Sequence, residues 1–136
     1  MNIMTRDTDY AVRSLAYMAC GRRGEIFTVP RLVRALGVPR PFLRKILQRL
    51  NREGIVRSSK GRGGGFTLAA APERIKVADL IGIFQGELAM SHCVLRKRPC
   101  PNRAACILRK KLKDVEQSVR SELRSITIAS LLARKG

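Results

Sequence analysis

The sequence predicts a mainly α-helical winged helix-turn-helix with a small β-hairpin wing and a long C-terminal helix. Three features predict it: two short amphipathic segments joined by a tight turn, a glycine-rich hairpin directly after them, and an apolar stripe near the C-terminus. At 136 residues the chain is long enough to build one hydrophobic core, with room for an appendage.

The first predicted helix covers residues 8–19, where apolar side chains recur at helical spacing. Thr8 or Asp7 is placed to cap the free N–H groups at its start. Cys20 falls on the apolar side of this helix, so we expect it to be a buried small hydrophobic residue. A further helix is predicted at residues 77–86.

Two more helices are predicted at residues 28–37 and 41–54, separated only by a tight turn. Thr28 is the expected N-cap of the first of them, and Gly37 is its expected C-cap. The second has one continuous apolar stripe, formed by Phe42, Leu43, Ile46, Leu47 and Leu50.

The face opposite that stripe is basic. Arg44, Lys45 and Gln48 point outward and are residue types that read base edges in the DNA major groove. Residues placed for phosphate contacts are Arg40, Arg49 and Arg52. The basic residues of this face, Arg49 included, are expected to lack acidic partners four residues away, which favours DNA contact over a merely solvated face.

The segment IVRSSKGRGGGFTLAA, residues 55–70, predicts two short strands around a glycine-rich tip. Lys60 and Arg62 lie at this tip, and Arg62 is placed to enter a narrow minor groove. The glycines match neither a dinucleotide-binding loop nor a P-loop. The segment is therefore interpreted as a wing that contacts DNA.

The charge of the chain indicates a polyanionic partner. Lysine and arginine number 28 against 10 acidic residues, a formal net charge of +18 at pH 7. No long apolar run or signal peptide is present, which argues against a membrane and for the cytoplasm. With no Trp and 4% aromatic residues, the chain has few stacking platforms for single-stranded RNA, so double-stranded DNA is the expected partner.

Three cysteines, Cys93, Cys100 and Cys106, are spaced C-x6-C-x5-C among basic residues and prolines. A reducing compartment disfavours disulfides, and thiolates bind soft metals and iron–sulfur clusters. The spacing differs from the paired C-x2-C of zinc ribbons. On the residues alone, a metal site and three loosely exposed thiols both remain open.

From about Arg103 the chain is predicted to be helical again. Apolar residues recur at steps of three and four at Leu108, Leu112, Val115, Val119, Leu123 and Ile126. Such a stripe suits pairing with a second chain, although packing on its own domain would show the same period.

The segment TDYAVRSLAYMA, the wing KGRGGGFTLA, the VADLI helix and the three-cysteine loop before a long helix resemble the Rrf2 family of bacterial winged-helix transcription regulators. The resemblance covers nearly the whole chain. It implies a winged DNA-binding domain at residues 1–88, a cluster-binding loop at 89–106, and a dimerisation helix and tail at 107–136. It also implies a homodimer on a pseudo-palindromic operator, with an iron–sulfur cluster that tunes DNA affinity and is held by Cys93, Cys100 and Cys106.

Two branches of this family imply different fourth ligands. In the iron–sulfur cluster regulators a histidine follows the last cysteine by three residues, where this chain has Arg109, which cannot ligate. In the nitric-oxide-sensitive repressors an aspartate matching Asp9 completes a four-iron cluster from the partner subunit. The resemblance therefore favours Asp9 and a 4Fe-4S cluster, with 2Fe-2S as the alternative form. Asp7 and His92 are alternative ligands, and Asp9 is equally an ordinary acid at a helix start.

The resulting hypothesis is a homodimeric DNA-binding regulator, expected to be a repressor, that senses redox, nitric oxide or iron status. The alternative is a zinc-bound or metal-free, thiol-based, redox-responsive nucleic-acid-binding protein. A thiol enzyme is disfavoured because no C-x-x-C and no general-base constellation accompany the cysteines.

Overall fold

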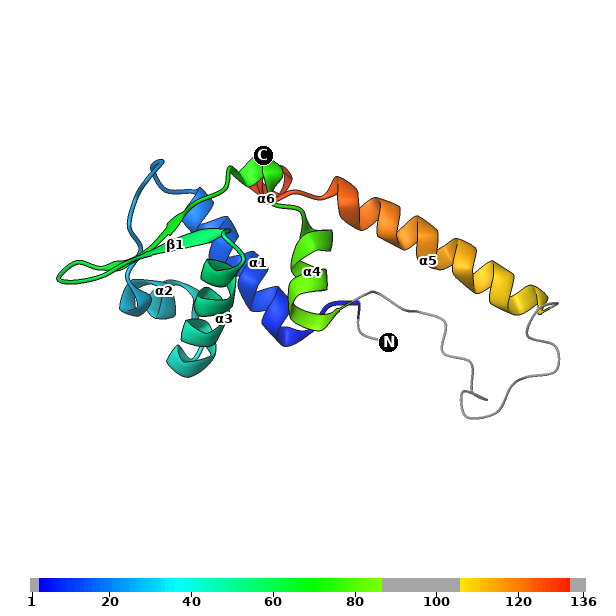
Figure 1. The fold of residues 1–136 in the computed structure, drawn as a ribbon, viewed down its shortest axis with the longest axis horizontal. Helices are drawn as coiled ribbons and strands as arrows, with labels where there is room; N and C mark the ends of the chain where they lie inside the picture. Colours follow the sequence, from blue (N-terminus) through cyan, green and yellow to red (C-terminus); the bar gives the residue numbers. More distant parts are fainter. Residues whose placement is uncertain (1–2, 87–105, 133–136) are drawn as a thin grey trace.

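The computed structural model describes residues 3–86 and 106–132, and its elements follow the order of a winged helix (Figure 1). Three helices come first: α1 (Arg6–Ala19), α2 (Val29–Leu36) and α3 (Arg40–Arg52). They precede a two-stranded antiparallel hairpin of β1 (Val56–Ser59) and β2 (Gly65–Leu68). The remaining elements are η1 (Pro72–Arg74), α4 (Val77–Gln85), α5 (Ile107–Ser125) and α6 (Ile128–Leu132). The predicted mainly helical fold with a hairpin wing is confirmed.

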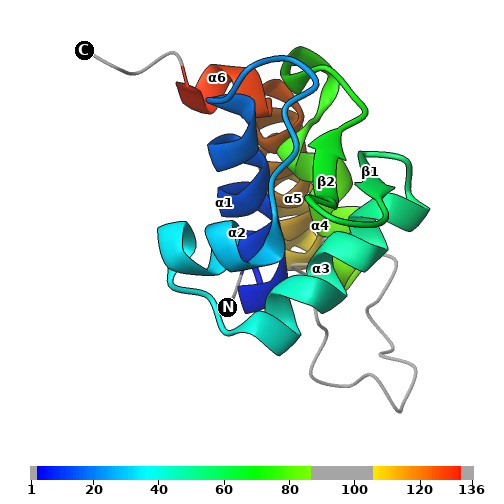
Figure 2. The ribbon, with the colours of Figure 1, turned by 90° about the vertical axis from the view of Figure 1, so that its left-hand side faces the viewer.

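Helix α1 lies at the centre of the fold, in contact with α2, α3, α4 and α6. The hairpin, α2 and α3 gather at one end of the molecule, and α5 projects from the other side (Figures 1 and 2). The core forms where these elements meet, around the fully buried side chains Leu15, Met18, Phe27, Leu32, Leu43, Leu47, Leu50, Leu80 and Ile128. Their burial fixes the direction in which α3 and the wing face.

The start and the end of α1 both differ from the sequence prediction. The N-cap is Thr5, whose side chain accepts a hydrogen bond from the Thr8 N–H, while Thr8 itself is buried inside the first turn. Cys20 is exposed, so its predicted burial was wrong. It is the C-cap and follows the last helical residue, where the chain turns away from the core.

The helix-turn-helix forms as predicted at its caps. Thr28 accepts a hydrogen bond from the Arg31 N–H at 3.3 Å, and Gly37 ends α2 in the left-handed conformation with φ of 65°. In α3 the predicted core stripe holds for Leu43, Ile46, Leu47 and Leu50, which are at most 3% exposed. Phe42 departs from it and is 45% exposed, because it lies about 100° around the helix from Leu43, at the edge of the stripe.

The wing is tied to the rest of the fold through Phe27. In the hairpin Val56 pairs with Leu68 and Ser59 with Gly65. Phe27 adds an isolated antiparallel bridge to Phe66, with N–H to C=O distances of 2.8 and 2.9 Å. A Cβ atom at Gly65 would collide with the carbonyl group of Phe27, so this close approach requires glycine.

The C-terminal end of the described chain returns to the winged domain, which the apolar periodicity did not predict. Helix α5 ends at Ser125, and Ile126 lies in extended backbone rather than in the helix as predicted. The Val77 N–H donates to the Ile126 carbonyl at 3.0 Å, and the Ile128 N–H donates to the Ile75 carbonyl at 2.9 Å. Ile128, at the start of α6, is completely buried. Helix α5 is thus anchored at its C-terminal end.

Candidate nucleic-acid interface and metal ligands

Helix α3 and the wing, which carry the predicted DNA-contact residues, lie at the same end of the molecule (Figures 1 and 2). Leu43, Leu47 and Leu50 fix the inward face of α3, so the opposite face is open to solvent. All of the predicted DNA-contact residues are exposed: Arg40, Arg44, Lys45, Gln48, Arg49, Lys60 and Arg62. The structure therefore places the two predicted DNA-contact segments, α3 and the wing, on the same end of the fold.

Most of this positive charge has no acidic neighbour. Arg49 is an exception, since its Nη2 atom lies 3.3 Å from Oε1 of Glu53, one helical turn away. The expectation that Arg49 lacks such a partner was therefore wrong. Among the described residues, Arg44, Lys45 and Arg62 form no ion pair. Cations without an acidic partner attract a polyanion. The guanidinium groups of Arg44 and Arg62, the ammonium group of Lys45 and the amide group of Gln48 can bind phosphates or base edges.

Arg31, at the start of α2, is a residue that the sequence reasoning did not single out. Its guanidinium carbon lies 4.5 Å from the centre of the Phe27 ring and 5.9 Å from that of Tyr17. On another side, its Nη2 atom is 3.7 Å from Oε2 of Glu25, a buried atom without a hydrogen-bond partner. The aromatic faces and the carboxylate together hold this cation in one orientation. The available signal was a basic residue directly after a proline in the first turn of a helix.

A hydrogen-bond network around Gln85 joins the end of α4 to the start of α1. Its Oε1 atom accepts from the Thr5 N–H at 2.9 Å and from the Thr8 hydroxyl at 2.8 Å, and its Nε2 donates to the Ile3 carbonyl at 3.0 Å. The network fixes the first turn of α1. That turn includes Asp9, whose carboxylate pairs with Nε of Arg13 at 3.0 Å.

Two of the four preferred cluster ligands fall within the described residues. Cys106 is partly buried and is the N-cap of α5, at the positive end of the helix dipole. Asp9 lies in the first turn of α1, well apart from the start of α5 in the fold (Figure 1). Cys93, Cys100 and the alternative ligand His92 lie outside the described residues. Within residues 3–86 and 106–132, no three His, Cys, Asp or Glu side chains gather as a metal site.

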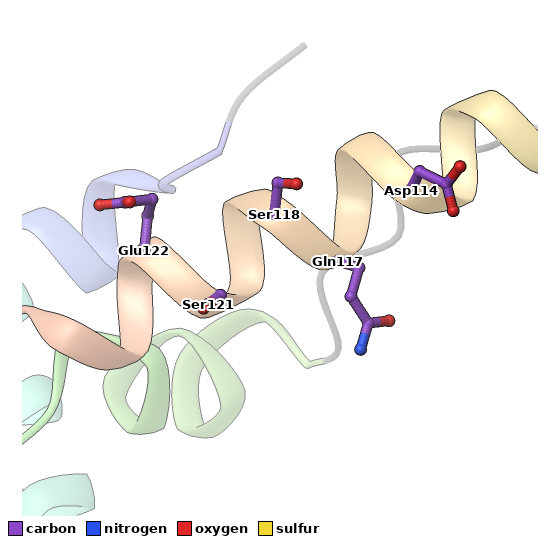
Figure 3. Close-up of a pocket in the computed structure, with 5 residues that line it drawn as sticks. All are labelled: Asp114, Gln117, Ser118, Ser121 and Glu122. Atoms are coloured by element: carbon purple, nitrogen blue, oxygen red, sulfur yellow. The ribbon is translucent and has the colours of Figure 1, made fainter.

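Helix α5 has one exposed apolar side and one polar side. Ile107, Leu108, Leu112 and Val115 are between 38 and 74% exposed, and they form the α5 apolar patch. Elsewhere on the helix, a shallow depression of about 400 Å³ is lined by Asp114, Gln117, Ser118, Ser121 and Glu122 (Figure 3). Figure 3 shows that these side chains project from the helix in different directions rather than converging on one point. Across the described part of the chain, no helix is both long and apolar enough to cross a lipid bilayer.

The fold and the exposed basic helix beside a wing define a winged helix-turn-helix DNA-binding protein. Comparison with known families extends this conclusion. Residues 4–134 match the model of the Rrf2 family, described as iron-dependent transcriptional regulators. The chain belongs to the Rrf2 family, and it is a transcription regulator rather than an enzyme.

Individual relatives agree with this assignment. The chain is 35% identical over 131 residues to the HTH-type transcriptional repressor NsrR of Streptomyces coelicolor, which covers 96% of this chain and 88% of the relative. The solved structure of T. potens IscR superposes with a TM-score of 0.76 at 24% identity, over 99% of this chain and 89% of that one. CymR, the global cysteine regulator of B. subtilis, superposes with a TM-score of 0.78 at 17% identity over 100% of both chains.

Proposed function

We propose that the protein is a homodimeric repressor whose two winged domains bind the two halves of a pseudo-palindromic operator. The observation that supports this most directly is the exposed basic face of α3, where Arg44 and Lys45 form no ion pair, at the same end of the molecule as the wing (Figure 1). In this proposal Arg44, Lys45 and Gln48 contact base edges. Contacts with the sugar-phosphate backbone come from Arg40, Arg49 and Lys60, and Arg62 enters the minor groove.

The α5 apolar patch supports a second copy of this chain as its partner. Ile107 and Leu108, at the first two positions of α5, are 74 and 67% exposed, which is unusual for neighbouring large aliphatic side chains. A twofold axis would place the same patch of both subunits face to face, and each patch would then be removed from water. The same axis would present two α3 helices to successive major grooves.

We also propose that Cys93, Cys100 and Cys106 hold an iron–sulfur cluster, with Asp9 of the partner subunit as fourth ligand and 4Fe-4S as the preferred form. Three thiolates and a carboxylate are a suitable donor set for iron. Within one chain the start of α1, where Asp9 lies, is far from the start of α5, where Cys106 is the N-cap, which supports a ligand contributed by the partner (Figure 1). The cluster would make the protein sensitive to oxidants, to nitric oxide or to a lack of iron. Gln85 would hold the α1 turn that presents Asp9.

A second candidate is regulation through the thiols alone or through zinc. The full-length superposition on CymR, a cysteine regulator, is the observation that favours this candidate. The same fold can therefore serve regulators that respond to different signals. Both candidates share the DNA-binding half of the proposal and differ only in what the cysteines hold.

Elemental analysis separates the two candidates. Protein purified without oxygen is expected to contain iron and acid-labile sulfide and to show broad visible absorption. Cys100→Ser should abolish that absorption, and Asp9→Ala should shorten the lifetime of the cluster in air. The matched control is Cys20→Ser, since Cys20 is exposed at the end of α1 and should be irrelevant to the cluster. Zinc alone, or no metal in protein that still binds DNA, would support the second candidate instead.

The DNA-binding half has its own test. Arg62→Ala should weaken binding to most sequences and reduce the slope of log K against log salt by about 1 per half-site, because each subunit loses one cation at the DNA surface. The control is Arg124→Ala, which removes an exposed cation from the last turn of α5. Equal salt slopes for Arg62→Ala and the unmodified protein would mean that Arg62 of the wing does not contact DNA.

A further inference from the structure

Phe42 is an exposed aromatic ring in the first turn of α3. Between Phe27 and Gly86, a stretch that the structure describes completely, it is the most exposed large apolar side chain, at 45%. The sequence pattern assigned this ring to the core. Instead, the core of α3 is closed by Leu43, Ile46 and Leu47 without it.

The surroundings of Phe42 are cationic rather than apolar. Lys45 and Arg49 follow it by three and seven residues, so they lie next to it along one side of the helix, and Arg40 lies within the same turn. All three are exposed. A protein partner with an apolar surface would have to desolvate these charges, whereas a DNA groove complements them.

The position of Phe42 on α3 also favours DNA. In helix-turn-helix proteins the N-terminal residues of the second helix are those that reach the base edges. A phenyl ring has no donor or acceptor, so it cannot read the polar pattern of a base pair. The single apolar group on the major-groove edges is the 5-methyl group of thymine, and phenylalanine is a residue type that packs against it.

We propose that Phe42 is a specificity-determining residue that selects thymine at one position of each operator half-site by packing against the thymine methyl group. This inference rests on the proposed DNA-binding function and adds a contact of different chemistry to it. Arg44, Lys45 and Gln48 recognise hydrogen-bonding groups, and Phe42 recognises a methyl group.

The test removes the methyl group from the DNA and the ring from the protein, separately and together. The preferred duplex is first selected from randomised DNA with the full-length protein under anaerobic conditions. Each thymine of the half-site is then replaced by deoxyuridine, which lacks only the 5-methyl group. The unmodified protein should lose about fourfold in affinity at one thymine per half-site, the factor expected for one methyl group that binding removes from water.

The protein variants complete the cycle. Phe42→Ala should bind the thymine duplex about fourfold less tightly per half-site and should bind thymine and deoxyuridine duplexes equally at that position. The matched control is Leu131→Ala, because Leu131 is 44% exposed but lies on α6, away from α3 (Figure 2). It should retain the full preference for thymine. Thermal unfolding should be similar for the two variants, because the two side chains are exposed to nearly the same extent.

Several results would overturn the inference. Tolerance of deoxyuridine at every position by the unmodified protein would exclude a methyl contact. If Phe42→Ala kept the preference for thymine, another residue would be responsible. If Phe42→Ala lost the same affinity for all duplexes, the ring would contact the sugar-phosphate backbone and not a base. If its affinity for all duplexes were unchanged, the ring would not contact DNA, and a protein partner would be the better explanation of its exposure. Failure of the unmodified protein to select any DNA sequence would contradict the proposed function itself, which is a distinguishable outcome.

Discussion

The apolar face of α3 is buried within its own chain, whereas the N-terminal half of the apolar face of α5 is exposed. Both helices repeat apolar residues at steps of three and four, and both are rich in lysine and arginine elsewhere. Yet Leu43, Leu47 and Leu50 are completely buried, while Leu108 is 67% and Val115 48% exposed. Periodicity thus reveals that a helix has an apolar partner and does not reveal whether that partner belongs to the same chain.

The largest difference between the two helices should appear in folding stability. Leu47→Ala in α3 would leave a cavity in a completely buried site, and we expect a loss of about 2–5 kcal/mol in the free energy of unfolding. Leu108→Ala in α5 should cost less than about 0.5 kcal/mol under conditions where the protein is monomeric. Urea unfolding of both variants measures this difference. Similar losses for both would mean that Leu108 packs on its own chain.

The second difference concerns assembly. Leu112→Asp would place a charge in the α5 apolar patch, so the proposed dimer should dissociate while the winged domain remains folded. Loss of the second half-site should lower operator affinity about a hundredfold, because the linked binding of two domains is lost. Analytical ultracentrifugation and operator titration measure the two effects. Gln117→Asp, on the polar side of α5, is the control that should remain dimeric. A dimeric Leu112→Asp protein would exclude the patch as the interface.

The smallest difference concerns the polar faces. Glu53→Gln would release Arg49 from its ion pair, which costs little because such exposed pairs contribute only about 0.3–0.5 kcal/mol. The free guanidinium should bind DNA better, and we expect a roughly twofold gain in affinity. Glu122→Gln in α5 removes the same charge far from α3 and should have no effect at moderate salt, where charges beyond about 10 Å are screened. Fluorescence titration with a labelled operator can resolve the difference. If Glu53→Gln bound the operator with equal or lower affinity, Arg49 would not be a DNA-contact residue.

Local signals explain why much of the winged fold was predictable from the sequence. Thr28, Gly37 and the glycines of the wing act on their immediate neighbours through capping and turn formation, and the structure confirms the elements that they predict. The exposed cations of α3 were also predictable, because burial of the leucine stripe forces the opposite face outward.

The features that the sequence did not reveal depend on contacts between distant residues. Thr5 replaces Thr8 as the N-cap because Gln85, eighty residues away, binds both of them. Phe42 and Cys20 are exposed because other elements close the core without them. Ile126 continues the apolar period of α5, but its backbone pairs with Val77 instead. The candidate ligands Cys93 and Cys100 lie outside the described residues, so their assignment stays a prediction.

The return of the chain to Ile75 and Val77 has a consequence for folding during synthesis. The backbone bonds of Ile126 and Ile128 to this segment, with the buried Ile128 side chain, close the core from the C-terminal side. A ribosome must therefore add more than fifty residues after Ile75 before this closure can form. Until then, the N-terminal helices and wing lack part of their core, so the emerging winged domain should reach full stability only near the end of translation. The chain would in this way acquire its DNA-reading form only after α5 has been made.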